Sequence, residues 1–354
     1  MKKELLLASA LVGTVGLSGV AQAASADFSW SGHTRNGVTW NDTDAAGDAL
    51  MTGHQQSSLS LSLSSTTDNN TTITTGFDIT NENDEDTDSS GLTFTFNNGI
   101  KLDVIEAGSA YASHLASVPS AAGEQGIAST TIMAAPTGLD YADQNDLVGF
   151  ELHSGEDFLT VPGLKAGVSA SFNGDAAATT SAHAAENSFS VGASYVATAG
   201  DTNITVGGGF FTSDTVATAA TSDTQSTAFS IAAVTGKVTV GVGYASGAYL
   251  KGNGVVDEQV TGASITTAGI SYALDGFTFN LGFASGEGTD SVLGAAATAA
   301  SADSYEETAA SVGYAIASGV SATIGYSDRS RSTENLAVPT NSGTSWYIGA
   351  DVSF

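Results

Sequence analysis

The chain has 354 residues, of which 9 are basic and 37 are acidic, so its formal net charge at pH 7 is −28. A surface with so little basic charge cannot neutralise a phosphate backbone, which excludes nucleic-acid binding. The chain contains 42 glycines and no cysteine, so its fold cannot depend on disulfides. Its large apolar residues occur singly at alternate positions, not in the runs expected of a soluble core.

Residues 1–23 have the features of a bacterial secretory signal. Lys2 and Lys3 precede a long apolar stretch, and Ala21–Gln22–Ala23 fits an A-x-A cleavage site. An uncleaved membrane anchor is the alternative, but no stop-transfer charge follows the apolar stretch. We expect cleavage after residue 23 and a single domain over residues 24–354. Removing two lysines and one glutamate leaves 7 basic and 36 acidic residues, a net charge of −29.

Alternation of apolar and polar residues predicts about sixteen β-strands in the remaining chain. Two segments, LVGFELHS and TAFSIAAV, alternate weakly, so the expectation is an even number of strands near sixteen. Short turns with Gly are predicted at Asn97–Asn98–Gly99, Thr235–Gly236, Leu274–Asp275–Gly276 and Ala317–Ser318–Gly319. Longer polar stretches lie between the hairpins, among them 81–90, 107–146, 212–225 and 246–263. This alternation of short turns and long loops is typical of a transmembrane β-barrel.

The two faces of the predicted strands differ in chemistry. In the first strand the even positions Phe28, Trp30, Val38 and Trp40 would face lipid, and the odd positions would face the lumen. The same parity places the following charged or titratable residues inside: His33, Arg35, Asp78, Lys101, Asp103, Glu151, Lys165, Lys237, Arg329 and Asp351. Aromatic residues such as Phe189, Tyr195, Phe277 and Phe283 gather near strand ends, as in interfacial girdles. The alternatives are a soluble β-sandwich, and a β-solenoid or adhesin, although no short internal repeat is present.

The last residues, GTSWYIGADVSF, also alternate, with apolar side chains at Trp346, Ile348, Ala350, Val352 and Phe354. A final strand of this kind is compatible with a closed barrel, because pairing of the last strand with the first leaves no edge.

The chain resembles bacterial general porins, and among these the alphaproteobacterial, Rhodobacter-type group. The resemblance rests on the N-terminal signal, the first strand FSWSGHTRNGVTW, the long third loop at about 107–146 and the end WYIGADVSF. It implies a transmembrane antiparallel β-barrel of about 16 strands in the bacterial outer membrane. It also implies a homotrimer that passes small hydrophilic solutes by diffusion, without a cofactor. Lipopolysaccharide would be a neighbour, and the barrel-assembly machinery would recognise the Phe354 strand.

The resemblance further implies that the third loop folds into the barrel and sets carboxylates against basic wall residues. The carboxylates would be Glu124, Asp140 and Asp143, and the wall would contribute Arg35 with His33 beside it. Lys101 would line the lower vestibule, and Arg329 would lie near the outer mouth. The chain departs from the family because no group of arginines clusters on one wall. An external lid is the alternative role for the loop.

The acidic charge has a functional interpretation. Most acidic residues lie in the predicted external loops, where they would concentrate cations and repel anions. We therefore expect a cation-preferring pore. The alternative is that these acids only solvate the loops or suit a saline habitat.

The segment NENDEDTDSSG places Asp84, Asp86 and Asp88 at alternate positions of a predicted loop. Carboxylates at this spacing can bind Ca²⁺, so a weak site that bridges to lipopolysaccharide or to a neighbouring subunit is one hypothesis. The segment is not an EF-hand, because Ser89 and Thr95 replace the required Gly and Glu. A solvated acidic loop is the other interpretation.

No catalytic motif is present: the chain lacks G-x-S-x-G, H-E-x-x-H and a P-loop, and its five histidines are scattered. The sequence favours a non-enzymatic porin. A substrate-selective channel and a non-conducting structural or adhesive barrel remain the alternatives.

Overall fold

The computed structural model describes residues 27–43, 51–81, 85–89, 91–104, 109–121, 148–172, 183–217, 221–252, 257–292, 301–332 and 340–354. The predicted secretory signal lies outside these residues. No helix in the described part of the chain is long and apolar enough to cross a membrane.

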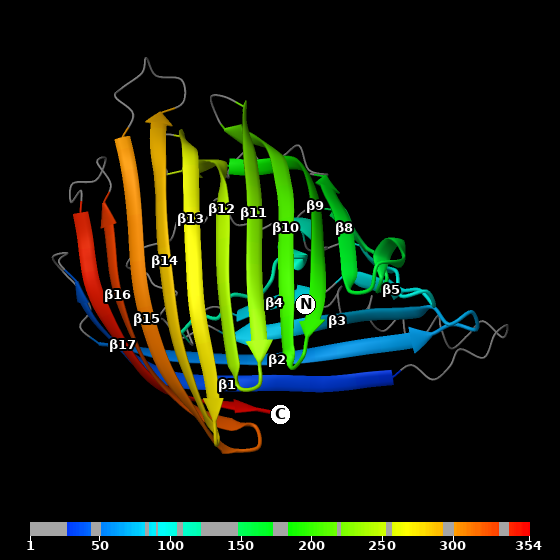
Figure 1. The fold of residues 1–354 in the computed structure, drawn as a ribbon, viewed down its shortest axis with the longest axis horizontal. Coiled ribbons are helices and arrows are strands. Elements are labelled where there is room, and N and C mark those ends of the chain that lie inside the picture. The colour runs from blue at the N-terminus through cyan, green and yellow to red at the C-terminus, as the bar shows by residue number, and fades with distance from the viewer. Residues whose placement is uncertain are drawn as a thin grey trace.

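The described residues form seventeen strand segments and two short helical turns (Figure 1). The first half of the chain contains β1 (Asp27–Thr43), β2 (Thr52–Thr66), β3 (Thr72–Asn81), β4 (Glu85–Ser89), β5 (Leu92–Thr95), β6 (Lys101–Val104), α2 (Ala110–Ser113), β7 (Val148–His153), η2 (Phe158–Thr160) and β8 (Leu164–Phe172). The second half contains β9 (His183–Ala199), β10 (Thr202–Ala217), β11 (Thr221–Thr235), β12 (Val238–Gly252), β13 (Asp257–Leu274), β14 (Phe277–Val292), β15 (Ser301–Ala317), β16 (Val320–Ser332) and β17 (Thr340–Ser353).

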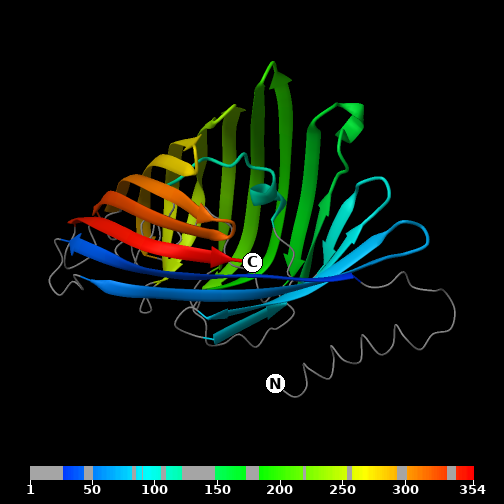
Figure 2. The same ribbon diagram turned by 90° about the horizontal axis from the view of Figure 1, so that it is seen from below.

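These segments make one closed antiparallel barrel of sixteen strands. β4 and β5 pair with β3 one after the other, so they are two parts of a single strand. β17 pairs with β1 from Thr43 opposite Gly343 to His33 opposite Ser353. Figure 2 shows β17 beside β1 at this seam. The predicted fold class and the expectation of about sixteen strands are confirmed.

The short turns occur where the Gly-containing dipeptides predict them. Between β13 and β14 both Asp275 (φ 48°) and Gly276 (φ 87°) have positive φ. Positive φ at both central residues defines the type I′ turn, whose twist matches that of the paired strands. Between β11 and β12 the turn also includes Lys237, so this residue is not an inward-facing strand residue as the parity predicts.

The outer face of the barrel is apolar. In β17 the even residues Trp346 and Ile348 are each 50% exposed, whereas Tyr347 between them is 3% exposed. Aromatic rings contact one another near the turn that begins β14 (Phe277–Tyr314) and midway along β16 and β17 (Tyr326–Trp346), with ring centroids 4.6 Å apart in both pairs. So much exposed apolar surface is unsuited to water and matches the lipid-facing band of a transmembrane barrel.

Several strands extend beyond their predicted ends. β10 continues to Ala217 and β11 begins at Thr221, so most of the predicted loop 212–225 is strand. The predicted loop 81–90 contains β4, and β12 and β13 extend into 246–263. The reason is that apolar alternation marks only the lipid-facing part of a strand. Hydrogen bonding to a neighbouring strand continues through polar residues where no lipid contact requires an apolar side chain.

The facing of β13 can be tested with a matched pair of substitutions. Ile270 is 41% exposed on the apolar face, and Ser271 lies on the opposite face. We expect Ile270→Lys to lower the free energy of unfolding by up to about 2–4 kcal/mol, because it places a charge in the hydrocarbon. Ser271→Lys should stay within about 0.5 kcal/mol of the parent, as for a solvated site. Guanidinium unfolding in phospholipid vesicles measures both, and equal losses would contradict the assigned faces.

Candidate functional site

The inner face of the barrel is lined mainly by serine, glycine and charged residues. Ser169, Ser190, Ser226 and Ser230 project from β8, β9 and β11 and are each at most 5% exposed. Their hydroxyl groups are buried because the segment Ser109–Ala121, which includes α2, lies against them. Figure 2 shows α2 inside the ring of strands.

Hydrogen bonds attach this segment to the wall. The backbone N–H of Ala110 donates to Ser169 Oγ (3.2 Å), and that of Tyr111 donates to Ser190 Oγ (3.1 Å). Farther along, the N–H of Ala116 donates to Ser230 Oγ (2.6 Å). Each bond satisfies a backbone donor that would otherwise be buried without a partner, so the serine hydroxyls fix the position of the segment.

The ring of Tyr111 anchors the same segment. Its centroid lies 6.3 Å from that of Phe211, in a buried cluster with Ala228, Ala245 and Ala263. The Tyr111 hydroxyl lies 2.7 Å from Ser226 Oγ, so the polar end of the ring has a partner. The buried rings of Tyr111 and Phe211 thus form an apolar contact between the segment and the wall.

Inward-facing glycines allow the segment backbone to approach the sheet. A Cβ atom at Gly192 would lie 2.0 Å from the carbonyl oxygen of Ala110. One at Gly207 would lie 2.1 Å from the oxygen of His114, and one at Gly269 would lie 1.7 Å from that of Pro119. Any side chain at these positions would displace the segment, because the opposing atoms belong to the backbone.

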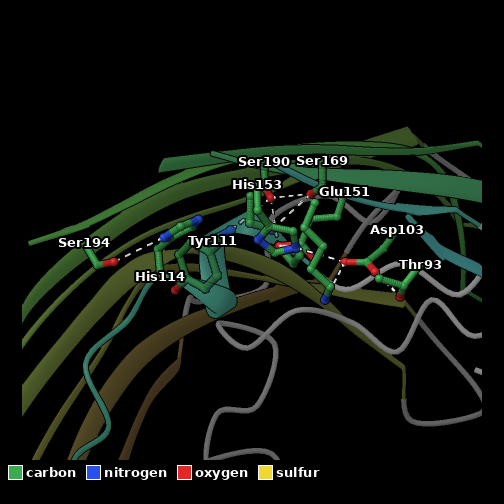
Figure 3. Close-up of polar contacts among 12 residues, drawn as sticks. Thr93, Asp103, Tyr111, His114, Glu151, His153, Ser169, Ser190 and Ser194 are labelled. Carbon is green, nitrogen blue, oxygen red and sulfur yellow. Dashed lines mark hydrogen bonds and ion pairs between the residues drawn. The ribbon is translucent and has the colours of Figure 1, made fainter. Parts of the chain in front are cut away.

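Polar and charged side chains gather where β6 pairs with β5 and β7, in a group that we call the Asp103 cluster: Thr93, Lys101, Asp103, Glu151 and His153 (Figure 3). His153 Nε2 lies 3.0 Å from Asp103 Oδ2 and 3.5 Å from Glu151 Oε1. Lys101 Nζ also lies 3.0 Å from Asp103 Oδ2, and Thr93 donates a hydrogen bond to Asp103 Oδ1. The cluster therefore combines an ammonium group, two carboxyl groups, an imidazole and a hydroxyl group on the inner wall.

His114 connects the segment to this cluster. Its ring centroid lies 6.0 Å from that of His153, and its Nδ1 lies 3.3 Å from Ser194 Oγ. Burial lowers the pKa of His114, and the nearby His153 and Lys165 lower it further. The neutral imidazole is therefore the favoured form at this position.

The other predicted site residues are spread over the wall. Arg35 donates to Asp351 Oδ2 (2.7 Å) across the seam between β1 and β17, and to Gln56 Oε1 (3.2 Å) on the neighbouring strand β2. His33 lies two residues away in β1, and Asp78 is exposed in β3. Arg329 is 2% exposed, with its Nε 3.3 Å from Glu307 Oε1 and 3.0 Å from Ser327 Oγ. Its charge is therefore buried and paired with Glu307.

The predicted loop sites have different outcomes. Glu124, Asp140, Asp143 and Asp84 lie outside the described residues, so the acidic side of the constriction and a Ca²⁺ site stay predictions. Asp86 and Asp88 belong to β4, where they pair with Thr80 and Asp78. The assignment of these two residues to a loop was wrong, because the polar Thr and Asp side chains do not prevent the backbone from pairing with β3.

Sequence reasoning missed the contact of Tyr111 and His114 with the wall, and treated the histidines as scattered. The contact between His114 and His153 leaves no local pattern in the sequence, because it joins segments that are distant in the chain. A signal for the Asp103 cluster was available, since Lys101, Asp103, Glu151 and His153 all have the inward parity of their strands.

Comparison with known proteins supports the fold only. No known family model and no curated protein matches the chain. Solved structures of outer-membrane barrels do match, and the chain covers 100% of each. A loop-deletion mutant of OmpT, an outer-membrane protein of Vibrio cholerae, matches over 94% of this chain with 14% identity and a TM-score of 0.61. A porin refined at 1.8 Å matches over 93% with 15% identity and a TM-score of 0.57. A mutant of Rh. blastica porin matches over 93% with 13% identity and a TM-score of 0.54.

Two neighbouring glycines of β10 test how the segment is held. Gly207 faces the segment, whereas Gly208 faces outward. A Cβ atom added at Gly208 would lie 3.3 Å from the nearest atom, the carbonyl oxygen of Ala228. We expect Gly207→Val to displace the segment and so to speed chymotryptic cleavage after Tyr111 in the folded barrel. Each 1.4 kcal/mol lost from the free energy that holds the segment against the wall should raise the cleavage rate about tenfold. Gly208→Val should cleave at the parent rate. Equal cleavage of the two variants would contradict the proposed contact.

Proposed function

We propose that this chain is an outer-membrane porin, a water-filled channel for passive diffusion of small hydrophilic solutes and ions. The observation that carries the proposal is a closed sixteen-strand barrel with an apolar outer face and a polar inner face. Barrels of this strand number are too wide for side chains to fill, so they enclose an aqueous passage. The likeness in fold to solved porins supports the same function. The proposed mechanism is diffusion without chemistry or a cofactor.

The third loop would set the size limit of this channel. The support is that its first part, Ser109–Ala121, lies against the inner wall and crosses several strands. We propose that the rest of the loop, with Glu124, Asp140 and Asp143, continues into the lumen and carries the acidic side of the constriction. His33 and Arg35 would then face it from the opposite wall.

We propose a preference for cations. Each of five basic residues has an acidic partner: Arg35 with Asp351, Lys101 with Asp103, Lys165 with Glu156, Lys237 with Asp275 and Arg329 with Glu307. These five basic charges are thus locally compensated, while the whole chain carries a net charge of −28. The remaining acidic excess would enrich cations at the channel mouth.

A homotrimer is the proposed assembly, with lipid and lipopolysaccharide around it and the barrel-assembly machinery recognising the Phe354 strand. The support is that in vitro folded OmpT of Vibrio cholerae, similar in fold at 13% identity with a TM-score of 0.60, is described in a trimer form. A substrate-selective channel and a non-conducting structural barrel are the alternatives.

Ion selectivity tests the charge argument. In a planar bilayer under a tenfold KCl gradient, we expect a reversal potential that favours K⁺. The preference should weaken as salt rises toward 1 M, because the Debye length then falls to about 3 Å. A preference for Cl⁻ would contradict the charge argument, and a complete absence of conductance would favour the structural barrel.

The conductance of the glycine variants tests the role of the third loop. We expect Gly207→Val to raise the single-channel conductance, because the displaced segment no longer narrows the lumen. Gly208→Val, on the outer face, should conduct like the parent protein. Parent-like conductance of Gly207→Val, together with faster cleavage after Tyr111, would show that the segment does not limit the flow.

A further inference from the structure

The Asp103 cluster contains a set of side chains suited to a metal ion. Asp103, Glu151 and His153 each offer one donor atom, and these atoms lie within 4.8 Å of one another. His153 Nε2 is 3.0 Å from Asp103 Oδ2 and 3.5 Å from Glu151 Oε1. Donor atoms placed about 2.0–2.1 Å from Zn²⁺ at tetrahedral angles lie roughly 3.4 Å apart. The two separations therefore bracket the spacing that a tetrahedral site requires.

Glu151 supplies an independent indication that a cation belongs here. The residue is 2% exposed, and its Oε1 atom accepts no hydrogen bond from the described residues. A buried carboxylate oxygen without a hydrogen bond is costly unless a cation or a proton neutralises it. This oxygen is also the one that lies 3.5 Å from His153 Nε2, so the unsatisfied atom is directed into the group (Figure 3).

The surroundings hold the donors in place. Thr93 donates to Asp103 Oδ1, which fixes the carboxylate and leaves Oδ2 directed toward His153. On the lumen side, His114 Nε2 is buried without a hydrogen bond from the described residues. This nitrogen lies against Gly167, which pairs with His153 on the neighbouring strand. Oriented carboxylates and a nearby second imidazole are features of protein metal sites.

We propose that Asp103, Glu151 and His153 form a binding site for a divalent transition-metal ion such as Zn²⁺ on the inner wall of the barrel. One imidazole and two carboxylates are ligands that Zn²⁺ accepts in proteins. The site is distinct from the acidic segment at residues 84–88 and does not depend on the proposed porin function.

Lys101 competes with the metal ion. Its Nζ atom lies 3.0 Å from Asp103 Oδ2, and this oxygen is the one that would bind the metal. The Lys101 side chain is 44% exposed, so it can turn into the lumen when the ion binds. A bound metal and a nearby ammonium repel each other, and removal of the ammonium should therefore strengthen metal binding. A merely structural ion pair would not show this effect.

Isothermal titration of the folded, metal-stripped barrel in detergent with ZnCl₂ tests the proposal. We expect one Zn²⁺ to bind per chain. His153→Ala and Glu151→Gln should each weaken Zn²⁺ binding by about 10- to 100-fold or more, because loss of a residue that only hydrogen-bonds to a metal ligand already has an effect of this size. His54→Ala and Glu306→Gln are matched controls outside the cluster and should bind like the parent. Lys101→Met should bind more tightly. Co²⁺ absorption reports the same site spectroscopically.

Two results would overturn the proposal. One is the absence of saturable Zn²⁺ binding to the parent protein. The other is equal weakening by the cluster variants and the controls, which would indicate adventitious binding at other surface groups. Far-ultraviolet circular dichroism establishes that each variant has the strand content of the parent. If His153→Ala does not fold, Glu151→Gln and Lys101→Met, which change affinity in opposite directions, still decide the question.

Discussion

Closure of the sheet is the constraint on which the rest of this structure depends. In hydrocarbon no water can satisfy a backbone N–H or C=O group, so every strand needs a partner on both sides. The pairing of β1 with β17 supplies the last of these partners. It extends to Gly32 and Phe354, whose backbone groups exchange hydrogen bonds of 3.1 and 3.0 Å. Arg35 and Asp351 add an ion pair across the same seam.

Closure also fixes the chemistry of the inner face. Alternate residues must point into the lumen, and here many of them are glycine or serine. Small residues at these positions leave room for the backbone of Ser109–Ala121, and the serine hydroxyls satisfy its N–H groups. The wall and the segment are thus complementary: the strands provide small and hydroxyl side chains, and the segment packs its backbone against them.

The sequence predicted the features that depend on local periodicity. The facing of Trp346, Tyr347 and Ile348 follows from a period of two, and the turn at Asp275–Gly276 follows from backbone preferences. Strand ends were less predictable, because polar strands above the lipid band carry no apolar pattern.

The inner contacts were the hardest to predict, since they join residues far apart in the chain. The side chains of Tyr111 and Ser226 lie within hydrogen-bond distance, as do those of Asp103 and His153. No local sequence pattern links the members of either pair. Arg329 lies near the C-terminal end of β16, and its burial against Glu307 depends on packing that strand parity does not encode.

The central claim is that the barrel encloses a continuous aqueous passage, and a liposome swelling assay with uncharged sugars of increasing size tests it most directly. Uncharged solutes remove the influence of the acidic loops, so the rate reports the open cross-section alone. The account predicts rapid swelling with small sugars and a steep decline as the sugar grows. Swelling no faster than in protein-free liposomes, with protein shown to be inserted and folded, would contradict it.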